Sequence, residues 1–232
     1  MVENDERWNS TANIFFDLWS PLLDHEKDLI SRSIDVQNYN KNDIIYKIGE
    51  TPINIMYILD GRVKISRDTD DGRSKIIRIF CDGQFFAYRA FFAGEDYTTD
   101  CVAIESSRIV TFPTNVIARL IDGNKNIMRF FYKELAKGLG MSDYRVASLA
   151  QKHLRGRLAE TLIFLSNSFG TDSDGWIHGK TTRSDIANLA NMTTSNAIRT
   201  IAAFRKEGII ETEGKKIRIV KPERLQFISG KE

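Results

Sequence analysis

The chain has 232 residues, 42% of them hydrophobic, and a formal net charge of +2, which fits one large or two medium-sized globular domains. This composition excludes wholesale disorder, and no apolar run approaches the roughly 18 residues that a membrane-spanning helix needs. The N-terminus, MVENDERWNS, does not resemble a signal peptide. We therefore expect a cytoplasmic protein without a membrane partner.

The distribution of charge and the spacing of the cysteines further restrict the class of protein. Residues 151–232 carry 14 Lys and Arg against 9 Asp and Glu, a net of +5, whereas the rest of the chain has a net of −3. A basic C-terminal part agrees with a domain that binds phosphates, although an ordinary scatter of surface charge is the alternative. Cys81 and Cys101 lack C-x-x-C spacing, so we expect two buried thiols rather than a thiolate metal site.

The first half of the chain predicts two short helices followed by a β-rich region. Residues 14–23 are rich in apolar side chains, and Asp24–Ser33 has the pattern of a helix. From about residue 35 to 112, alternating segments such as YIL, VKIS, KIIRIF and QFFAY are separated by turns at Asp60-Gly61, Asp70-Asp71-Gly72 and Asp82-Gly83. Strands at this spacing predict a sandwich or barrel rather than a βαβ sheet.

Helical patterns return after Pro113. A helix is expected to begin at Thr114, and a long one over residues 126–150 would extend for about 38 Å. Its apolar positions are spread more widely than one seam, so one side is expected to cover the β-rich region and the other to pack on a second copy. Packing within the chain is the alternative. Gly138 and Gly140 cost about 1 kcal/mol each in a helix interior, which close approach of two helices or local bending would explain.

The segment TRSDIANLANMTTSNAIRTIAAFRKEG, residues 182–208, predicts two short helices joined by a tight turn. Thr182 and Asp185 have the spacing of a capping box, and Thr193 is placed to cap the second helix. Asn191 tolerates the left-handed conformation that a tight turn needs.

In the second helix, Ala197, Ile201 and Phe204 share the core-facing side. Thr194, Ser195 and Arg199 are left on the outer side, where a helix-turn-helix presents side chains to the major groove. A plain helical hairpin with a solvated polar face is the alternative.

Several further motifs occur in a fixed order along the chain. They are Tyr46-x-x-Gly49-Glu50, Met56-Tyr57-Ile58-Leu59-Asp60-Gly61-x-Val63, Asp71-Gly72-Arg73, Gly83-Gln84-Phe85-Phe86, Leu154-x-Gly156-Arg157-Leu158-Ala159-Glu160-Thr161-Leu162 and Glu213-Gly214-Lys215-Lys216-Ile217-Arg218-Ile219. With the helix pair, they make the chain resemble, nearly end to end, the Crp/Fnr family of bacterial transcription regulators. The first four resemble the family's β-roll, the fifth the start of its DNA-binding domain, and the sixth its wing.

The resemblance implies an α+β fold in three parts. These are an N-terminal double-stranded β-helix (jelly-roll) sensor domain over residues 1–124, a long dimerisation helix over 125–150, and a C-terminal winged helix-turn-helix domain over 151–232. It also implies a homodimer that binds a pseudo-palindromic site in double-stranded DNA, with RNA polymerase as a further partner. A small-molecule effector would reposition the two reading helices.

An enzyme is the first alternative to this function. The sequence has no phosphate-cradling glycine loop, nucleophile elbow or histidine–carboxylate motif, so we expect neither catalytic residues nor a metal site. A ligand-binding regulatory module that acts on a protein partner is the second alternative.

The chain differs from the best-known family members at the positions that would bind the effector. Members that bind cyclic AMP carry a Phe-Gly-Glu turn and a following Arg-Ser pair, and the matching positions here hold Phe86-Ala87-Tyr88 and Thr98-Thr99. Without that arginine a buried cyclic phosphate has no fixed cation, unless Arg89 replaces it, so we do not expect cyclic AMP. The iron–sulfur branch uses N-terminal cysteines, and none precedes Cys81.

The effector therefore remains unknown. The pocket implied between β-roll and long helix would be lined by Phe86, Tyr88, Arg89, Tyr97, Thr98, Thr99, Met141 and Ser142. Its aromatic character suits a haem, for which His153 or His25 would be the iron ligands, or an apolar metabolite. The third alternative is that no ligand binds. The aromatic side chains would in the last case simply fill the roll.

The resemblance also implies which residues contact DNA. The set is Thr182, Arg183, Thr193, Thr194, Ser195, Asn196, Arg199, Lys215 and Lys216. Arg199 is placed to bind a guanine through O6 and N7, while Ser195 occupies a position where family members often have Glu, so reading at that base is expected to differ. Thr182, Arg183 and the two wing lysines are placed near phosphates. Ile198 faces either a thymine methyl group or the core.

Overall fold

The computed structural model describes residues 11–68, 74–179 and 181–231. The chain forms two compact units, one running to Ile65 and again over Ile79–Met141, the other comprising Ser66–Arg78 and the residues from Ser142 onward. No helix within the described ranges has the length and apolar character to cross a bilayer. In the same ranges, no cluster of three or more His, Cys, Asp or Glu side chains is arranged to hold a metal ion.

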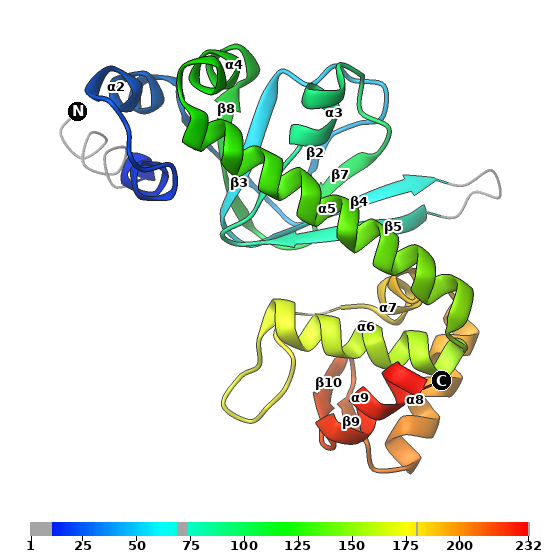
Figure 1. Cartoon of the computed structure of the whole chain (residues 1–232). Helices are drawn as coiled ribbons and strands as arrows, with labels where there is room; N and C mark the ends of the chain where they lie inside the picture. The colour runs from blue at the N-terminus through cyan, green and yellow to red at the C-terminus, as the bar shows by residue number, and fades with distance from the viewer. Residues whose placement is uncertain (1–10, 69–73, 180, 232) are drawn as a thin grey trace. The chain divides into compact units, whose positions relative to one another are not determined.

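Two four-stranded sheets form the β-roll (Figure 1). One sheet has the order β1(Asp35–Tyr39), β8(Ser107–Pro113), β3(Asn54–Asp60), β6(Phe85–Phe86), and the other β2(Ile44–Tyr46), β7(Asp100–Ala103), β4(Arg62–Asp68), β5(Ser74–Cys81). The pairs β1–β8, β3–β8, β3–β6 and β2–β7 are antiparallel. The first sheet is in register with Tyr57 opposite both Val110 and Phe85. The jelly-roll that the family resemblance implied is thus confirmed, and it agrees with the sandwich or barrel expected from the closely spaced strands.

The predicted helices of this unit are also present. Residues 11–18 are helical, α2 spans Asp24–Ser33 as expected, and α4 covers Thr114–Gly123. The turn expected at Asp70-Asp71-Gly72, together with the Asp71-Gly72-Arg73 motif, lies outside the described residues.

One strand prediction was wrong. The QFFAY segment is extended only over Phe85–Phe86, and helix α3 occupies Tyr88–Ala93. Ala87 between them has φ +65°, a left-handed conformation that turns the chain out of the sheet. Alanine gives no local sign of such a turn, so the apolar run looked like a continuous strand.

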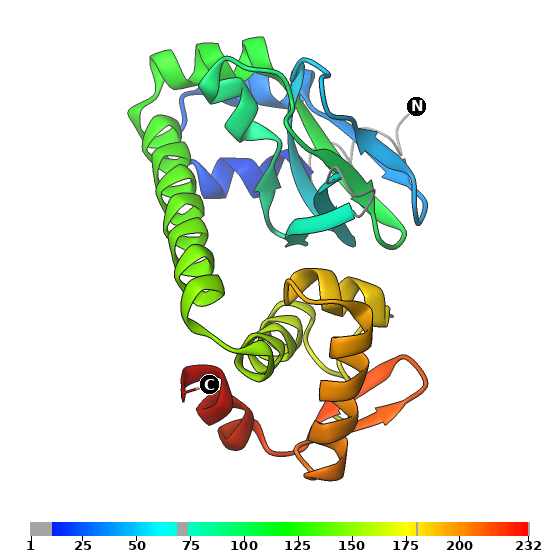
Figure 2. The ribbon, with the colours of Figure 1, turned by 90° about the vertical axis from the view of Figure 1, so that its right-hand side faces the viewer.

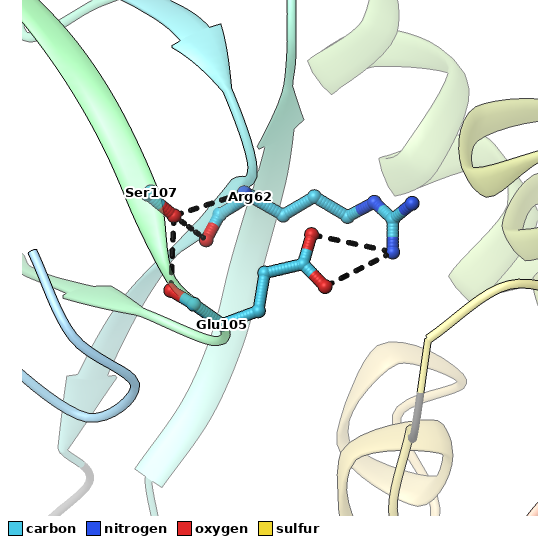
Figure 3. Close-up of polar contacts among 3 residues, drawn as sticks. All are labelled: Arg62, Glu105 and Ser107. Carbon is cyan, nitrogen blue, oxygen red and sulfur yellow. Dashed lines mark hydrogen bonds and ion pairs between the residues drawn. The ribbon is translucent and has the colours of Figure 1, made fainter.

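The turn between β3 and β4 is held against the turn that precedes β8 (Figure 3). Gly61 has φ +96°, and a Cβ there would lie 2.4 Å from Ser107 Oγ, so only glycine fits. The Arg62 amide donates to Ser107 Oγ at 3.2 Å, and Ser107 Oγ donates to the Glu105 carbonyl at 3.0 Å. The Arg62 guanidinium pairs with the Glu105 carboxylate at 3.4 Å. These contacts fix the Asp60-Gly61 turn that the sequence predicted.

The core of the first unit is aromatic and includes the long helix. Helix α5 spans Lys125–Gln151, one residue longer at each end than predicted. Its Ile127 and Phe131 are buried, and the Phe131 ring lies 5.7 Å from Phe85 and 6.1 Å from Trp19 between centroids. In Figure 1 the N-terminal part of α5 lies along the β-roll. One face of the helix therefore covers this core, as the wide spread of apolar positions indicated.

The second unit is a winged helix-turn-helix. Its elements are α6(Leu154–Phe169), α7(Arg183–Leu189), α8(Thr194–Lys206), β9(Ile210–Glu213), β10(Lys216–Ile219) and α9(Pro222–Lys231). Figure 2 shows the β9–β10 hairpin, in red-orange, next to the orange helix α8. Leu162 of α6, Ile186 of α7, Phe204 of α8 and Leu225 of α9 are all buried, so each helix contributes to one small core.

Candidate functional site

The start of α7 is fixed by the capping box that the sequence predicted. Thr182 Oγ1 accepts a hydrogen bond from the Asp185 amide at 3.0 Å. The Asp185 carboxylate in turn accepts from the Thr182 amide at 3.2 Å and from its hydroxyl at 2.6 Å. Two otherwise unpaired N–H groups at the helix start are satisfied in this way. The direction of α7 is therefore set by local sequence.

The turn and the second helix follow the prediction equally closely. Asn191 has φ +48°, and Thr193 Oγ1 accepts from the Asn196 amide at 3.2 Å as the N-cap of α8. Ala197, Ile201 and Phe204 are buried. Because these residues anchor one side of α8, its opposite side is exposed to solvent.

The exposed side of α8 carries the predicted reading residues. Thr194, Ser195 and Arg199 are exposed, and Asn196 is partly exposed at the edge. Ile198 is half-exposed, so it lies on the outer surface of α8 and not in the core. The Arg199 guanidinium donates to Asn196 Oδ1 at 2.5 Å, so the two polar side chains occupy one patch. Such a patch can offer N–H groups to base edges in the major groove.

The wing adds positive charge beside this patch. Strands β9 and β10 are joined by a two-residue turn, Gly214-Lys215, and the side chains of Lys215 and Lys216 are exposed. Arg183, at the start of α7, donates to the carbonyl oxygens of Gly214 and Lys215. Sequence reasoning assigned Arg183 to phosphate contact and missed this link, because no local pattern relates α7 to the wing.

The end of α5 is joined to α6 by a polar cluster inside the second unit. The Ser148 hydroxyl donates to the Glu160 carboxylate, which also accepts from Lys152 Nζ at 3.1 Å. Lys152 Nζ donates to the Tyr144 hydroxyl at 3.2 Å. Burial alone would raise the pKa of Glu160, but hydrogen bonds from Ser148, Tyr144 and Lys152 outweigh it and lower that pKa. The cluster was not predicted from sequence.

The sensor residues predicted in the first unit separate into buried and exposed groups. Phe86, Tyr88 and Tyr97 are each at most 6% exposed. The Tyr88 hydroxyl donates to the Glu134 carbonyl of α5 at 3.4 Å, and its ring lies 6.1 Å from that of Phe131. The aromatic side chains thus pack in the interior of the roll, where Tyr88 links α3 to α5.

The polar members of the predicted pocket lie nearer the surface. Arg89 is exposed, pairs with Glu95 and donates to Thr98 Oγ1 at 3.1 Å, so the fold does bring it to the Thr98-Thr99 pair. Thr99 is partly buried, whereas Met141 and Ser142 are exposed on α5. The Arg89 and Glu95 side chains of this ion pair are 56% and 44% exposed, so the pair is a weak surface contact.

A tyrosine pair beside Cys101 was missed by the sequence analysis. The rings of Tyr46 and Tyr97 stack with centroids 3.8 Å apart, and burial raises the pKa of both phenols. Burial also raises the pKa of the Cys101 thiol, and that of Cys81 to about 11. Both cysteines are buried and free, as predicted, and at neutral pH they are protonated and poorly reactive.

Comparison with known protein families matches two segments of the chain. Residues 36–124 match the cyclic nucleotide-binding domain family, and residues 156–228 match the Crp-like helix-turn-helix domain family. Electron transport regulator A of Shewanella oneidensis is 28% identical over 227 residues, covering 95% of this chain and 87% of that protein. The CRP-like cAMP-activated global transcriptional regulator of Mycobacterium tuberculosis is 25% identical over 198 residues, covering 84% and 88%.

Solved structures share the fold. FixK2 from Bradyrhizobium japonicum gives a TM-score of 0.77 at 18% identity, covering 84% of this chain and 96% of that one. A CRP/FNR-family transcriptional regulator from Thermus thermophilus gives 0.73 at 21% identity, covering 84% and 98%. The β-roll, the capped helix pair with its wing and these relatives together identify the chain as a member of the Crp/Fnr family of transcription regulators, whose members are not enzymes.

Proposed function

We propose that the protein is a homodimeric, sequence-specific regulator that reads a pseudo-palindromic DNA site with helix α8 of each subunit. The observation that carries this proposal is the exposed face of α8. Both helices of the pair have their N-caps satisfied, and Ala197, Ile201 and Phe204 are buried, so Ser195 and Arg199 are held outward on a rigid element. A reading helix needs this combination of rigid backbone and exposed polar side chains.

The proposed DNA contacts divide into two kinds. Arg199 and its neighbours Thr194, Ser195 and Asn196 would face base edges, since arginine forms two parallel hydrogen bonds with guanine. Lys215 and Lys216, with Thr193 and the start of α7 at Thr182, would lie near the phosphate backbone. Contacts of the second kind position the protein without reading sequence.

Dimerisation is proposed along α5. Tyr132, Leu139 and Val146 recur every seven residues and are 59%, 64% and 68% exposed. This spacing is that of one seam in a two-helix coiled coil. A Cβ added at Gly140 would meet nothing within 4 Å, so the described part of the subunit leaves the helix surface open there. A second copy of α5 would cover these residues and pair the two reading helices for consecutive half-sites.

The effector proposed here is neither cyclic AMP nor an iron–sulfur cluster. The Mycobacterium relative is cAMP-activated, but in this chain Tyr88 stands at the last position of the Phe-Gly-Glu turn and is buried, and Thr98-Thr99 stands in place of the Arg-Ser pair. Arg89 does reach Thr98, yet it is paired with Glu95. Addition of cyclic AMP is therefore expected to leave operator affinity unchanged.

The proposal is tested by selecting genomic fragments that bind the purified protein and measuring affinity for the enriched site and a scrambled duplex. Two-fold symmetry in the enriched sequence and a preference of at least about a thousandfold are expected. Sedimentation should show a dimer, and Leu139→Glu should give monomers that lose the preference. Lys133→Glu adds the same carboxylate to α5 away from the seam and should remain dimeric. Equal binding to all duplexes would contradict the proposal.

A further inference from the structure

Arg183 connects the first helix of the pair to the wing. Its Nη2 donates to the Gly214 carbonyl at 2.9 Å and its Nη1 to the Lys215 carbonyl at 3.3 Å. The side chain is partly buried, and that burial lowers the pKa of its guanidinium, which nevertheless remains charged at any physiological pH. A charged donor thus spans two carbonyl oxygens that lie about thirty residues further along the chain.

The two acceptors are the central residues of the wing turn. Glu213 pairs with Lys216 at the end of the β9–β10 ladder, so the turn consists of Gly214 and Lys215 alone. Gly214 has φ +55°, as the first central position of a tight hairpin turn requires. The carbonyl groups of the central residues point out of the ladder in such a turn. Arg183 is the side chain that binds them here.

The other end of the link is rigid. Arg183 is the first residue of α7, directly after the N-cap Thr182 and its capping box with Asp185. Ile186 and Ala187 of the same helix are buried in the core that also holds Phe204 of α8. The wing turn is therefore tied to the same rigid body that carries the exposed face of α8.

We propose that Arg183 is a positioning residue for DNA binding, which holds the wing turn so that Lys215 and Lys216 reach the phosphates in register with α8. This inference rests on the proposed DNA-binding function. It differs from the simpler expectation that Arg183 neutralises a phosphate itself, because its effect would pass through the two lysines. The two carbonyl oxygens are bound by different nitrogens of one planar guanidinium, whereas lysine presents its N–H donors from a single nitrogen on a shorter side chain and matches this pair less well.

Lysine replacement separates the two roles. If Arg183 contacts a phosphate directly, Arg183→Lys keeps the charge and retains affinity and salt dependence. If it positions the wing, Arg183→Lys lowers operator affinity nearly as much as Arg183→Ala. It also reduces the slope of log affinity against log salt concentration by about one, although the formal charge is unchanged. Arg205→Lys, an exposed arginine in the last turn of α8, is the matched control and should change neither quantity.

A double-mutant cycle gives a second readout. Lys215→Ala should weaken the wild type several-fold but have little further effect in Arg183→Lys, since the wing would already be displaced. Additive losses would show that Arg183 and Lys215 act independently and would overturn the proposal. Affinities are measured by fluorescence anisotropy with the selected site at four salt concentrations.

Hydrogen exchange on the DNA-free protein tests the link without relying on DNA binding. The amides of residues 213–216 should exchange faster in Arg183→Lys than in wild type, with α8 unchanged. Unchanged exchange in the wing would overturn the link itself. Faster exchange combined with wild-type operator affinity would overturn its role in DNA binding. If the wild type prefers no duplex, the proposed function fails, while the exchange result still decides whether Arg183 holds the wing.

Discussion

Replacing Arg199 with alanine separates DNA reading from folding. In the free protein Arg199 is exposed and its guanidinium donates to Asn196 one turn earlier on the same helix. Exposed pairs of this spacing contribute only about 0.2–0.5 kcal/mol to folding, and alanine favours a helix. We therefore expect the free energy of unfolding of Arg199→Ala to lie within about 0.5 kcal/mol of wild type.

The loss in DNA binding should be larger. A bidentate contact between arginine and guanine contributes about 1–3 kcal/mol of discrimination, or roughly 5- to 150-fold in specific affinity. Non-specific affinity should fall much less, because only one of many phosphate-facing charges changes. The ratio of specific to non-specific affinity is therefore the quantity to measure, at fixed salt, by competition with a scrambled duplex.

Arg205→Ala is the control for loss of charge. Arg205 is exposed in the last turn of α8, away from the N-terminal end of the helix that would enter the groove. It should weaken both duplexes alike and leave the ratio unchanged. If Arg199→Ala kept the ratio while Arg205→Ala lowered it, the reading face of α8 would be wrongly assigned.

Three further predictions concern the scaffold. Thr193→Ala removes the N-cap of α8 and should lower the free energy of unfolding of the C-terminal unit by about 1 kcal/mol in denaturant titrations, and Thr193→Asn should restore most of it. Phe131→Ala empties a fully buried aromatic site on α5 and should cost about 3–5 kcal/mol, which calorimetry would detect as a lower Tm; a loss under 1 kcal/mol would contradict the packing described. Because the pKa of Glu160 is lowered on folding from 4.5, its carboxylate stabilises the folded state above that pH and the contribution is lost as pH falls below it. Glu160→Gln should therefore be less stable than wild type at pH 7, with the difference shrinking toward pH 4, and a difference independent of pH would refute this assignment.

The features that sequence predicted well are those set by residues close together in the chain. The capping box of Thr182 and Asp185 depends on three-residue spacing, and the buried face of α8 on the helical period. The long helix α5 was predicted to within a residue at each end for the same reason. Such patterns are local and need no knowledge of the fold.

The features that were missed depend on contacts between distant segments. Arg183 meets Gly214 and Lys215 only once the wing has folded beside α7. The helix at Tyr88–Ala93 depends on Ala87 adopting a left-handed φ, which alanine rarely does without tertiary support. A sequence pattern could list these residues as candidates, but only the fold shows their partners.

The position of Tyr88 sets a condition on any effector that uses the sensor. The side chain is 5% exposed, packs near Phe131 and is hydrogen-bonded to the backbone of α5 at Glu134. Exposing a large apolar side chain costs about 1.5–3 kcal/mol, and a ligand that displaces Tyr88 must offset that cost. Such a ligand would shift the equilibrium between two arrangements of the proposed dimer only by the difference in its affinity for them. Because Tyr88 joins α3 to α5 through this packing and hydrogen bond, any ligand that takes its place must also replace that link.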